Sequence, residues 1–286
     1  MIPPHPAPHG HDPEARAGAL GAYDPAYVAA HLPRLKDWIH RYFRAEVLGI
    51  ERLPEGPFVA VGNHSGAALM PDCFVWLGAY YAARPARPLL TLCHDAIFDA
   101  YPTAVGRWVA RFGAIRAHPA IAAEALARGY AVQAYPGGDA DACRSWRRRH
   151  EIVFAGRTGY VELARAAGVP IVPVASLGGH GGLLILHDGV DWARALGLHR
   201  SLRLGALPLS LSLPWGLWLG PLPGYLPLPR HISVEVLDPI DVRGDTAQVD
   251  AAVRAALQAS IDRRRAGRWA RRAALFQSGA PRPGAL

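Results

Sequence analysis

The sequence predicts an α/β fold with a mostly parallel central sheet flanked by helices. Between residues 47 and 174, short apolar runs of strand length alternate with longer runs that have helical periodicity. Gly129 and Gly168 follow two of the helical runs, at positions where a helix is expected to end. With 286 residues, of which 51% are hydrophobic, the chain is long enough to bury one large sheet. We expect one large domain with appendages at both ends.

The N-terminal part is expected to be a tail followed by a helix. Residues 1–22 are rich in Pro, His, Gly and Ala and contain no secretory apolar region, so we expect a disordered tail. Residues 23–46 place apolar side chains three and four positions apart, which predicts an amphipathic helix or two helices separated at Pro33. Such a helix can dock on the core or lie on a membrane surface, and both interpretations stay open.

The central part of the chain, residues 47–245, contains the alternating elements. The expected strands are 58–62, 88–92, 130–135, 171–175 and a late strand at 231–237. The expected helices are 73–83, 102–112, 120–128 and 158–167. Pro71 has no amide proton and is tolerated best in the first turn of a helix, so the first of these helices should begin near Met70.

Residues 202–229 are almost uncharged, but they contain six prolines that would break a membrane-spanning helix. We therefore expect an apolar interfacial lobe anchored by Trp215, Trp218 and Tyr225, and reject a simple span. A buried, loop-rich wall of a substrate tunnel is the alternative. Residues 246–286 predict an Arg-rich C-terminal helix, to about residue 276, followed by a tail.

The charge of the chain favours anionic partners. The formal net charge is +8, and Lys36 is the only lysine, so the positive charge comes almost entirely from arginine. Phospholipid surfaces and nucleotide phosphates fit this balance. We do not expect nucleic acid, because no zinc-finger spacing, basic zipper or RNA-binding aromatic signature accompanies the arginines. Three widely separated cysteines predict free thiols in a reducing compartment and no metal site.

The most informative motif is Asn63-His64-Ser65-Gly66, which directly follows the expected strand 58–62. A histidine on such a turn can act as a general base when a carboxylate accepts its Nδ1 proton and leaves Nε2 free. Asp72 lies at the head of the next helix. On one straight helix, residues eight positions apart would be about 12 Å apart. A loop over residues 65–69 can fold Asp72 back, so we predict His64 as the base and Asp72 as its orienting group.

A second motif, Tyr135-Pro136-Gly137-Gly138, ends the expected strand 130–135, and Arg144 follows after a short loop. Glycines let an anionic group approach the main chain, and arginine supplies bidentate contacts to phosphate or carboxylate. The run of arginines at 147–149 is, by itself, more typical of a solvated basic face.

In this order, the motifs resemble the blocks of the lysophospholipid/glycerolipid acyltransferase superfamily. The Pro-Gly-Gly form and the helix start Arg157-Thr158-Gly159-Tyr160 are most similar to its monoacylglycerol/diacylglycerol acyltransferase-like branch. Residues 113–116 resemble the second block, and the resemblance covers roughly residues 45 to 240. Residues 47–245 are therefore expected to form an acyltransferase domain.

Two features depart from the family pattern. Seven residues separate His64 from Asp72, where the family usually has four. The Glu-Gly-Thr-Arg sequence of many relatives is absent, and the sequence does not decide whether Asp139, Asp141 or Glu151 replaces its Glu.

The resemblance implies transfer of a fatty acyl group from acyl-CoA or acyl-carrier protein to a hydroxyl of a glycerolipid or lysophospholipid, without a metal or bound cofactor. It implies His64 and Asp72 as catalytic residues. The candidate substrate-binding residues, with Arg116 and Arg144 for phosphates and the glycine amides for an oxyanion, are Asn63, Ser65, Gly66, Arg116, Pro136, Gly137, Gly138 and Arg144.

Membrane lipids are the expected acceptor source and anionic surface, which predicts a peripheral or monotopic protein on the cytoplasmic face of a membrane. Two alternatives stay open. A non-catalytic membrane lipid-binding protein could use the same fold, and Ser65 could serve a hydrolase, although the chain lacks Gly-x-Ser-x-Gly around this serine.

Overall fold

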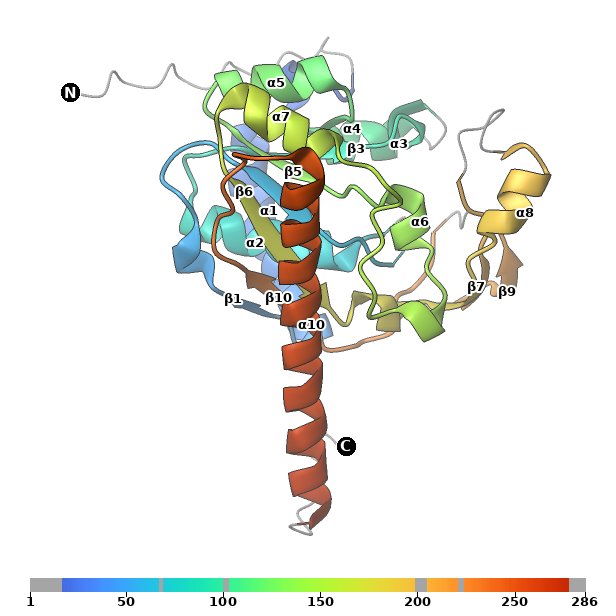
Figure 1. The fold of residues 1–286 in the computed structure, drawn as a ribbon. Coiled ribbons are helices and arrows are strands. Elements are labelled where there is room, and N and C mark those ends of the chain that lie inside the picture. Colours follow the sequence, from blue (N-terminus) through green and yellow to red (C-terminus); the bar gives the residue numbers. More distant parts are fainter. Residues whose placement is uncertain (1–16, 67–68, 100–102, 199–204, 221–223, 278–286) are drawn as a thin grey trace.

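A seven-stranded sheet in the order β1-β10-β6-β2-β5-β3-β4 forms the centre of the molecule, with helices on both faces (Figure 1). The structure, a computed structural model, describes residues 17–66, 69–99, 103–198, 205–220 and 224–277, and only the backbone of 269–277. The five strands from β6 to β4 run parallel, whereas β10 is antiparallel to β6. The predicted fold class is therefore confirmed. The strands are β1 (Glu46–Leu48), β2 (Val59–Gly62), β3 (Leu89–Cys93), β4 (Ala114–Arg116), β5 (Ala131–Ala134), β6 (Ile171–Leu177) and β10 (Ser233–Val236).

The handedness of the crossovers explains which helix covers which face. The helices α2 (Pro71–Ala83) and α4 (Thr103–Arg111) connect strands that advance toward β4, whereas α5 (Pro119–Ala127) and α7 (Gly159–Ala167) connect strands that advance toward β6. Because such crossovers are right-handed, the two directions place the helices on opposite faces of the sheet. α5 and α7 accordingly pack on each other, and the short α3 (Ala96–Asp99) packs on α4.

The elements predicted between residues 58 and 237 begin and end within two residues of their observed bounds. α2 begins at Pro71 after Met70, as the position of the proline predicted. The edge strands β1 and β4 were not predicted, because each is only three residues long. A strand this short leaves little periodicity in the sequence.

At the N-terminus, one helix, α1 (Pro25–Phe43), runs through Pro33 without a break, which settles the choice between one helix and two. It packs on α2, and its buried residues include Leu32, Ile39 and Phe43, whereas Trp38 is exposed. Residues 17–22 were predicted as part of a disordered tail. This is wrong for these six residues, because they form a turn in which the Gly18 carbonyl accepts a hydrogen bond from the Arg116 amide. Residues 1–16 lie outside the described part.

A second, smaller sheet stands beside the main one (Figure 1). Its antiparallel strands are β7 (Leu184–His187), β8 (Leu209–Ser212) and β9 (Gly216–Leu219), and α8 (Val190–Ala195) follows β7. The predicted apolar lobe at 202–229 thus contains a hairpin, which corrects the loop-rich alternative. Residues 202–204 and 221–223 lie outside the described part. Among the described helices, none combines the length and hydropathy needed to cross a membrane.

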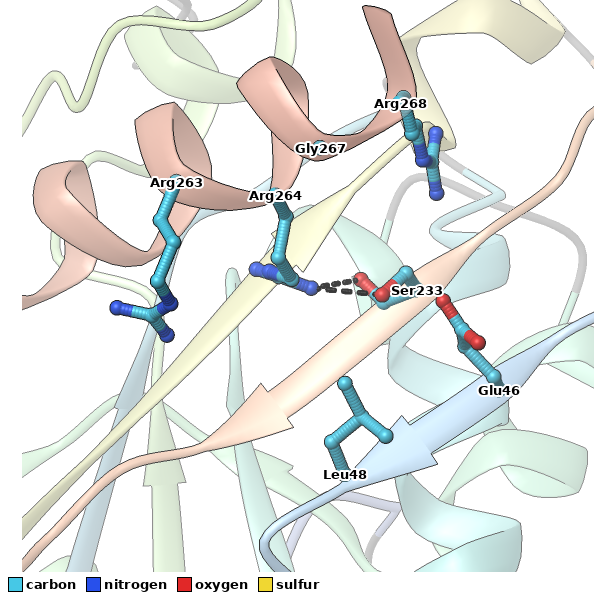
Figure 2. Close-up of a pocket in the computed structure, with 7 residues that line it drawn as sticks. All are labelled: Glu46, Leu48, Ser233, Arg263, Arg264, Gly267 and Arg268. Atoms are coloured by element: carbon cyan, nitrogen blue, oxygen red, sulfur yellow. Dashed lines mark hydrogen bonds between the residues drawn. The ribbon is translucent and has the colours of Figure 1, made fainter. Parts of the chain in front are cut away.

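Arginine side chains of the C-terminal helix α10 (Thr246–Gln277) form hydrogen bonds with the sheet (Figure 2). A groove of about 350 Å³ lies between α10, β1 and β10. In this groove, Arg264 donates hydrogen bonds to the carbonyl and Oγ of Ser233, at 2.8 and 2.9 Å. Figure 2 shows these side chains. Arg264 also donates to the Ala175 carbonyl, and Arg263 donates to both carboxylate oxygens of the buried Glu235. These pairs give the groove arginines a structural role.

Replacing Arg264 with Ala should destabilise the fold by about 2–4 kcal/mol, because buried acceptors on β6 and β10 lose their donor and Glu235 loses a neighbouring charge. Urea unfolding measures this change. Arg265→Ala, one position along on the exposed side of α10, is the control and should change stability by less than about 0.5 kcal/mol. Equal effects of the two substitutions would contradict the structural role of Arg264.

Candidate active site

The parallel sheet brings three loops together at the carboxyl ends of adjacent strands. β2 lies between β5 and β6, so the residues that follow these strands meet at one edge of the sheet. His64 follows β2, the Pro136–Gly137–Gly138 turn follows β5, and a Gly-rich loop that contains His180 follows β6. Such edges are where open α/β sheets usually bind their ligands. The two motifs singled out in the sequence are therefore neighbours in space.

Asn63 connects the loop after β2 to β6 by hydrogen bonds. Its side-chain amide donates to the Ser176 carbonyl at 3.0 Å, and its side-chain oxygen accepts from the Ser176 amide at 2.8 Å. Asn63 is 2% exposed, so both groups need these partners. Asn63 was predicted to bind substrate, and its described contacts instead fix the backbone that leads into His64.

The buried carboxylate of Asp141 holds the backbone of His64. It accepts the amide proton of His64 through Oδ2 at 2.5 Å and that of Val153 through Oδ1 at 3.3 Å. It also forms an ion pair with Arg144, three residues further along the chain. Asp141 lies on α6 (Gly138–Ala142), is 0% exposed, and is thus fully removed from water.

The Pro-Gly-Gly turn makes room for this carboxylate. A Cβ atom on Gly137 would lie 2.1 Å from the Val153 carbonyl oxygen and 2.2 Å from the Cβ of Asp141. Gly138 has a φ of +51°, which is unfavourable for a side chain, and its amide donates to the Tyr135 carbonyl. That bond occupies one of the amides proposed for an oxyanion. The Pro136 carbonyl accepts from Arg157 at 3.2 Å.

Arg144 is buried, with 1% of its surface exposed. It therefore does not belong to the solvated basic face expected for the arginines at 147–149. Nη1 of the Arg144 guanidinium pairs with the Asp141 carboxylate, whereas Nε and Nη2 lack a hydrogen-bond partner among the described residues. Burial lowers the pKa of Arg144 to about 10, and the nearby carboxylate of Asp72 opposes this shift. A buried cation with unused donors is suited to binding an anionic oxygen.

The Asp72 side chain is buried and makes no hydrogen bond with His64. Its carboxyl group is near Ser65 and Gly179, since a Cβ on Gly179 would lie 1.9 Å from the Ser65 Oγ and 3.4 Å from the Asp72 Cγ. Burial raises the pKa of Asp72 to about 6, while the nearby side chains of Ser65 and Ser176 act in the opposite direction. Oδ1 of Asp72 and Nδ1 of His64 both lack a hydrogen-bond partner among the described residues. The two side chains are therefore not joined in this structure.

The surroundings of His64 keep its imidazole neutral. Burial, followed by the positive charge of Arg144, lowers the pKa of His64 to about 4. The ring makes an edge-on contact with Tyr135, with 5.3 Å between ring centres. A second buried imidazole, His180, lies at the backbone of His64, and burial lowers its pKa well below the ordinary value. A neutral imidazole can accept a proton at physiological pH.

The remaining predicted residues have different positions. Arg116 ends β4, three strands from β2, and its guanidinium is paired with Asp95 and Asp99 at 3.0 and 2.7 Å. The Gly66 carbonyl accepts a hydrogen bond of 2.5 Å from the buried hydroxyl of Tyr225, which belongs to the apolar lobe. The lobe therefore touches the loop that carries His64.

Sequence reasoning missed Asp141, His180 and Gly179 as members of this site. Asp141 was considered only among three acidic residues, because its contact with His64 spans 77 positions and depends on the pairing of β2 with β5. The Gly178–Gly182 run after the expected strand at 171–175 was an available signal, since two glycines before a histidine and two after it are unusual at a strand end. Among the described residues, no group of His, Cys, Asp or Glu is arranged to hold a metal ion.

The sequence model of the acyltransferase family matches residues 44–177, which contain the loops after β2 and β5 and the whole of β6. Over this stretch the chain is therefore similar to the acyltransferase family.

Curated relatives come from mycobacteria. Uncharacterized proteins of Mycobacterium tuberculosis and Mycobacterium bovis are each 29% identical over 232 residues, which is 80% of this chain and 61% of theirs. One from Mycobacterium leprae is 29% identical over 231 residues, or 80% of this chain and 59% of its own. The chain thus spans about three fifths of their length. Among solved structures, the 1-acyl-sn-glycerophosphate (LPA) acyltransferase PlsC from Thermotoga maritima matches 82% of this chain and 80% of its own, with 18% identity and a TM-score of 0.49.

Asp72→Asn should stabilise the protein at high pH. The pKa of Asp72 is about 6 in the folded state and 3.8 ordinarily, so its ionisation destabilises the folded state. This loss of stability begins above pH 4 and is complete above about pH 6. The stability difference between the variant and the natural protein should grow from near zero at pH 4 to roughly 2–3 kcal/mol at pH 8. Urea unfolding at both pH values measures it.

Asp191→Asn, at a side chain that is 88% exposed, is the matched control for this charge removal. A difference for Asp72→Asn that stays constant from pH 4 to pH 8 would contradict the assigned cause.

Proposed function

We propose that this protein is an acyltransferase that moves a fatty acyl group from a thioester, acyl-CoA or acyl-carrier protein, to a hydroxyl of a glycerolipid or lysophospholipid. The observation that supports this best is the neutral, partly buried imidazole of His64 beside the buried guanidinium of Arg144. A base and a fixed positive charge at one sheet edge suit attack on a carbonyl carbon. The match of residues 44–177 to the acyltransferase family model supports the same reaction class.

In the proposed reaction, Nε2 of His64 takes the proton of the acceptor hydroxyl while the hydroxyl oxygen bonds to the thioester carbonyl carbon. Negative charge develops on the carbonyl oxygen of the tetrahedral intermediate. The C–S bond then breaks, and the departing thiolate takes the proton back from the His64 imidazolium. Each proton and electron pair is accounted for without a covalent enzyme intermediate or a bound cofactor.

Two further groups have proposed roles in this reaction. Arg144 is proposed to bind the developing oxyanion or an anionic group of either substrate, because it has unused donors. Asp72 is proposed to accept the Nδ1 proton of His64, since pairing would satisfy two buried atoms that now lack partners. This pairing requires a side-chain movement when substrate binds. Membrane lipids are the proposed acceptor source, at the cytoplasmic face of a membrane.

Incubation of the purified protein with acyl-CoA or acyl-carrier protein and a panel of glycerol, monoacylglycerol, diacylglycerol and lysophospholipid acceptors tests this proposal by mass spectrometry. An acylated acceptor is the expected product. Acceptor binding without turnover would instead favour a non-catalytic lipid-binding protein, and release of free fatty acid would favour a hydrolase.

His64→Ala should abolish turnover and leave the fold intact, because His64 is held through its backbone and its side chain supplies the base. In the natural protein, kcat/KM should stay level from about pH 7 to pH 8 and fall as the pH drops through about 6, where the orienting carboxylate of Asp72 takes a proton. It should fall further as the pH approaches 4, where the imidazole becomes protonated. His94→Ala, at an exposed histidine just after β3, is the control and should remain active. A decline in kcat/KM centred well above pH 7 would contradict a neutral, buried base.

Arg144→Met should remove turnover and also destabilise the protein by about 3–5 kcal/mol, since it leaves Asp141 as an unpaired buried charge. The double variant Arg144→Met/Asp141→Asn should recover much of this stability while turnover stays low, because the guanidinium is still absent. Urea unfolding and the acyl-transfer assay separate the two effects. Full activity in the stable double variant would show that Arg144 serves only the fold.

A further inference from the structure

The small sheet has an inverted pattern of side chains. Along β8, Ser210 and Ser212 are 0% and 7% exposed, whereas Leu211 between them is 48% exposed. Leu217 and Leu219 on β9 are 63% and 57% exposed. A sheet that covers a core normally buries its apolar face and exposes its polar one. Here leucines point outward and serines point inward, and each serine hydroxyl lacks a hydrogen-bond partner among the described residues.

The outward leucines form one continuous face. In the register of β8 and β9, Leu211 pairs with Leu217 and Leu209 pairs with Leu219, so each pair lies on the same side of the sheet. Leu184 of β7 pairs with Leu211 and extends the face across a third strand. We call Leu184, Leu209, Leu211, Leu217 and Leu219 the leucine face.

This concentration of apolar surface is not a general property of the molecule. Of the sixteen large apolar side chains that are exposed among the described residues, ten lie between Leu186 and Leu228. Large exposed apolar patches on proteins mark sites of membrane or protein contact.

A basic turn packs against β7 of the same small sheet. The 3-10 turn Trp146–Arg148 packs against β7 and places the exposed side chains of Trp146 and Arg147 beside the small sheet. The guanidinium of Arg149 stacks 3.5 Å from the centre of the Trp146 ring. Arg265 of α10 lies close enough to Arg149 to lower its pKa, after the effect of burial. Two arginines that close together are complementary to an anionic surface, and an exposed tryptophan is typical of the bilayer interface.

We infer that the leucine face, with the basic turn beside it, is the surface by which this protein docks on an anionic phospholipid bilayer. This inference rests on the proposed function for its choice of partner, because the proposed acceptor is a membrane lipid. The leucines enter the boundary between headgroups and acyl chains, and the arginines bind lipid phosphates. The hydrogen bond from Tyr225 to Gly66 connects the same lobe to the His64 loop, so docking places the bilayer next to the candidate site.

Vesicle sedimentation of the full chain tests the inference, with neutral phosphatidylcholine vesicles and with vesicles that also contain phosphatidylglycerol. Leu211→Ser/Leu217→Ser should lower the partition coefficient by about tenfold or more on both vesicle types. The reason is that the variant loses the favourable free energy of transferring two leucine side chains from water into the bilayer. Leu48→Ser/Val105→Ser, at side chains that are 43% and 40% exposed elsewhere on the molecule, is the matched control and should bind like the natural protein.

The basic turn is tested separately. Arg147→Gln and Arg149→Gln should each weaken binding to anionic vesicles by about fivefold at low salt and have little effect on neutral vesicles. Arg128→Gln, at a partly exposed arginine on another surface, is the control. Loss of binding in the control variants as well, or equal binding by the leucine variant and the natural protein, would overturn the assignment of the surface.

Two further measurements distinguish the remaining outcomes. Sedimentation equilibrium without lipid should show no self-association that depends on the leucine face, and a dimer abolished by Leu211→Ser/Leu217→Ser would identify the face as an interface between copies and overturn the inference. Turnover of a water-soluble short-chain acyl thioester and acceptor should be unchanged in that variant. If the natural protein binds vesicles as expected but does not turn over any substrate, the docking surface stands and the proposed function fails.

Discussion

The contact on which the candidate site depends is the buried carboxylate of Asp141. It binds the backbone of His64, the backbone of Val153 and the guanidinium of Arg144, three groups that approach from different parts of the chain. An unpaired charge in this position would be strongly destabilising, so the fold requires the carboxylate and the guanidinium together. The glycine at position 137 follows from the same contact, because no other residue leaves room for the carboxylate.

This arrangement has consequences for proton transfer. Arg144 brings a positive charge close to His64 and helps to keep the imidazole neutral, which is the state that a general base requires. Burial raises the pKa of Asp72 at the same sheet edge, so its negative charge is a cost to the fold at neutral pH. Groups of this kind, destabilising in the fold and shifted in pKa, are typical of functional sites. The large apolar core around β2, β5 and β6 supplies the stability that tolerates them.

The sequence was sufficient for the inner strands of the main sheet, for its longer helices and for the place of His64 after a strand, because hydrophobic periodicity and proline placement are local signals. The partner of the His64 backbone could not be predicted. Asp141 reaches His64 only because β2 pairs with β5. The sequence alone did not distinguish Asp141 from the nearby carboxylates of Asp139 and Glu151. The proximity of Asp72 to Ser65 instead of the His64 ring likewise depends on how the Gly179 loop packs. The hairpin in the apolar lobe was not predicted but could have been, since Leu209-Ser210-Leu211-Ser212 alternates with the period of a strand.

The central claim is direct acyl transfer with His64 as the base, and intact-protein mass spectrometry during a single turnover tests it most directly. Excess enzyme is mixed with an acyl thioester, first alone and then with a hydroxyl acceptor. An unmodified enzyme mass is expected in both cases, with an acylated acceptor in the second. An enzyme that gains the mass of the acyl group, with the adduct located on Ser65, would contradict it.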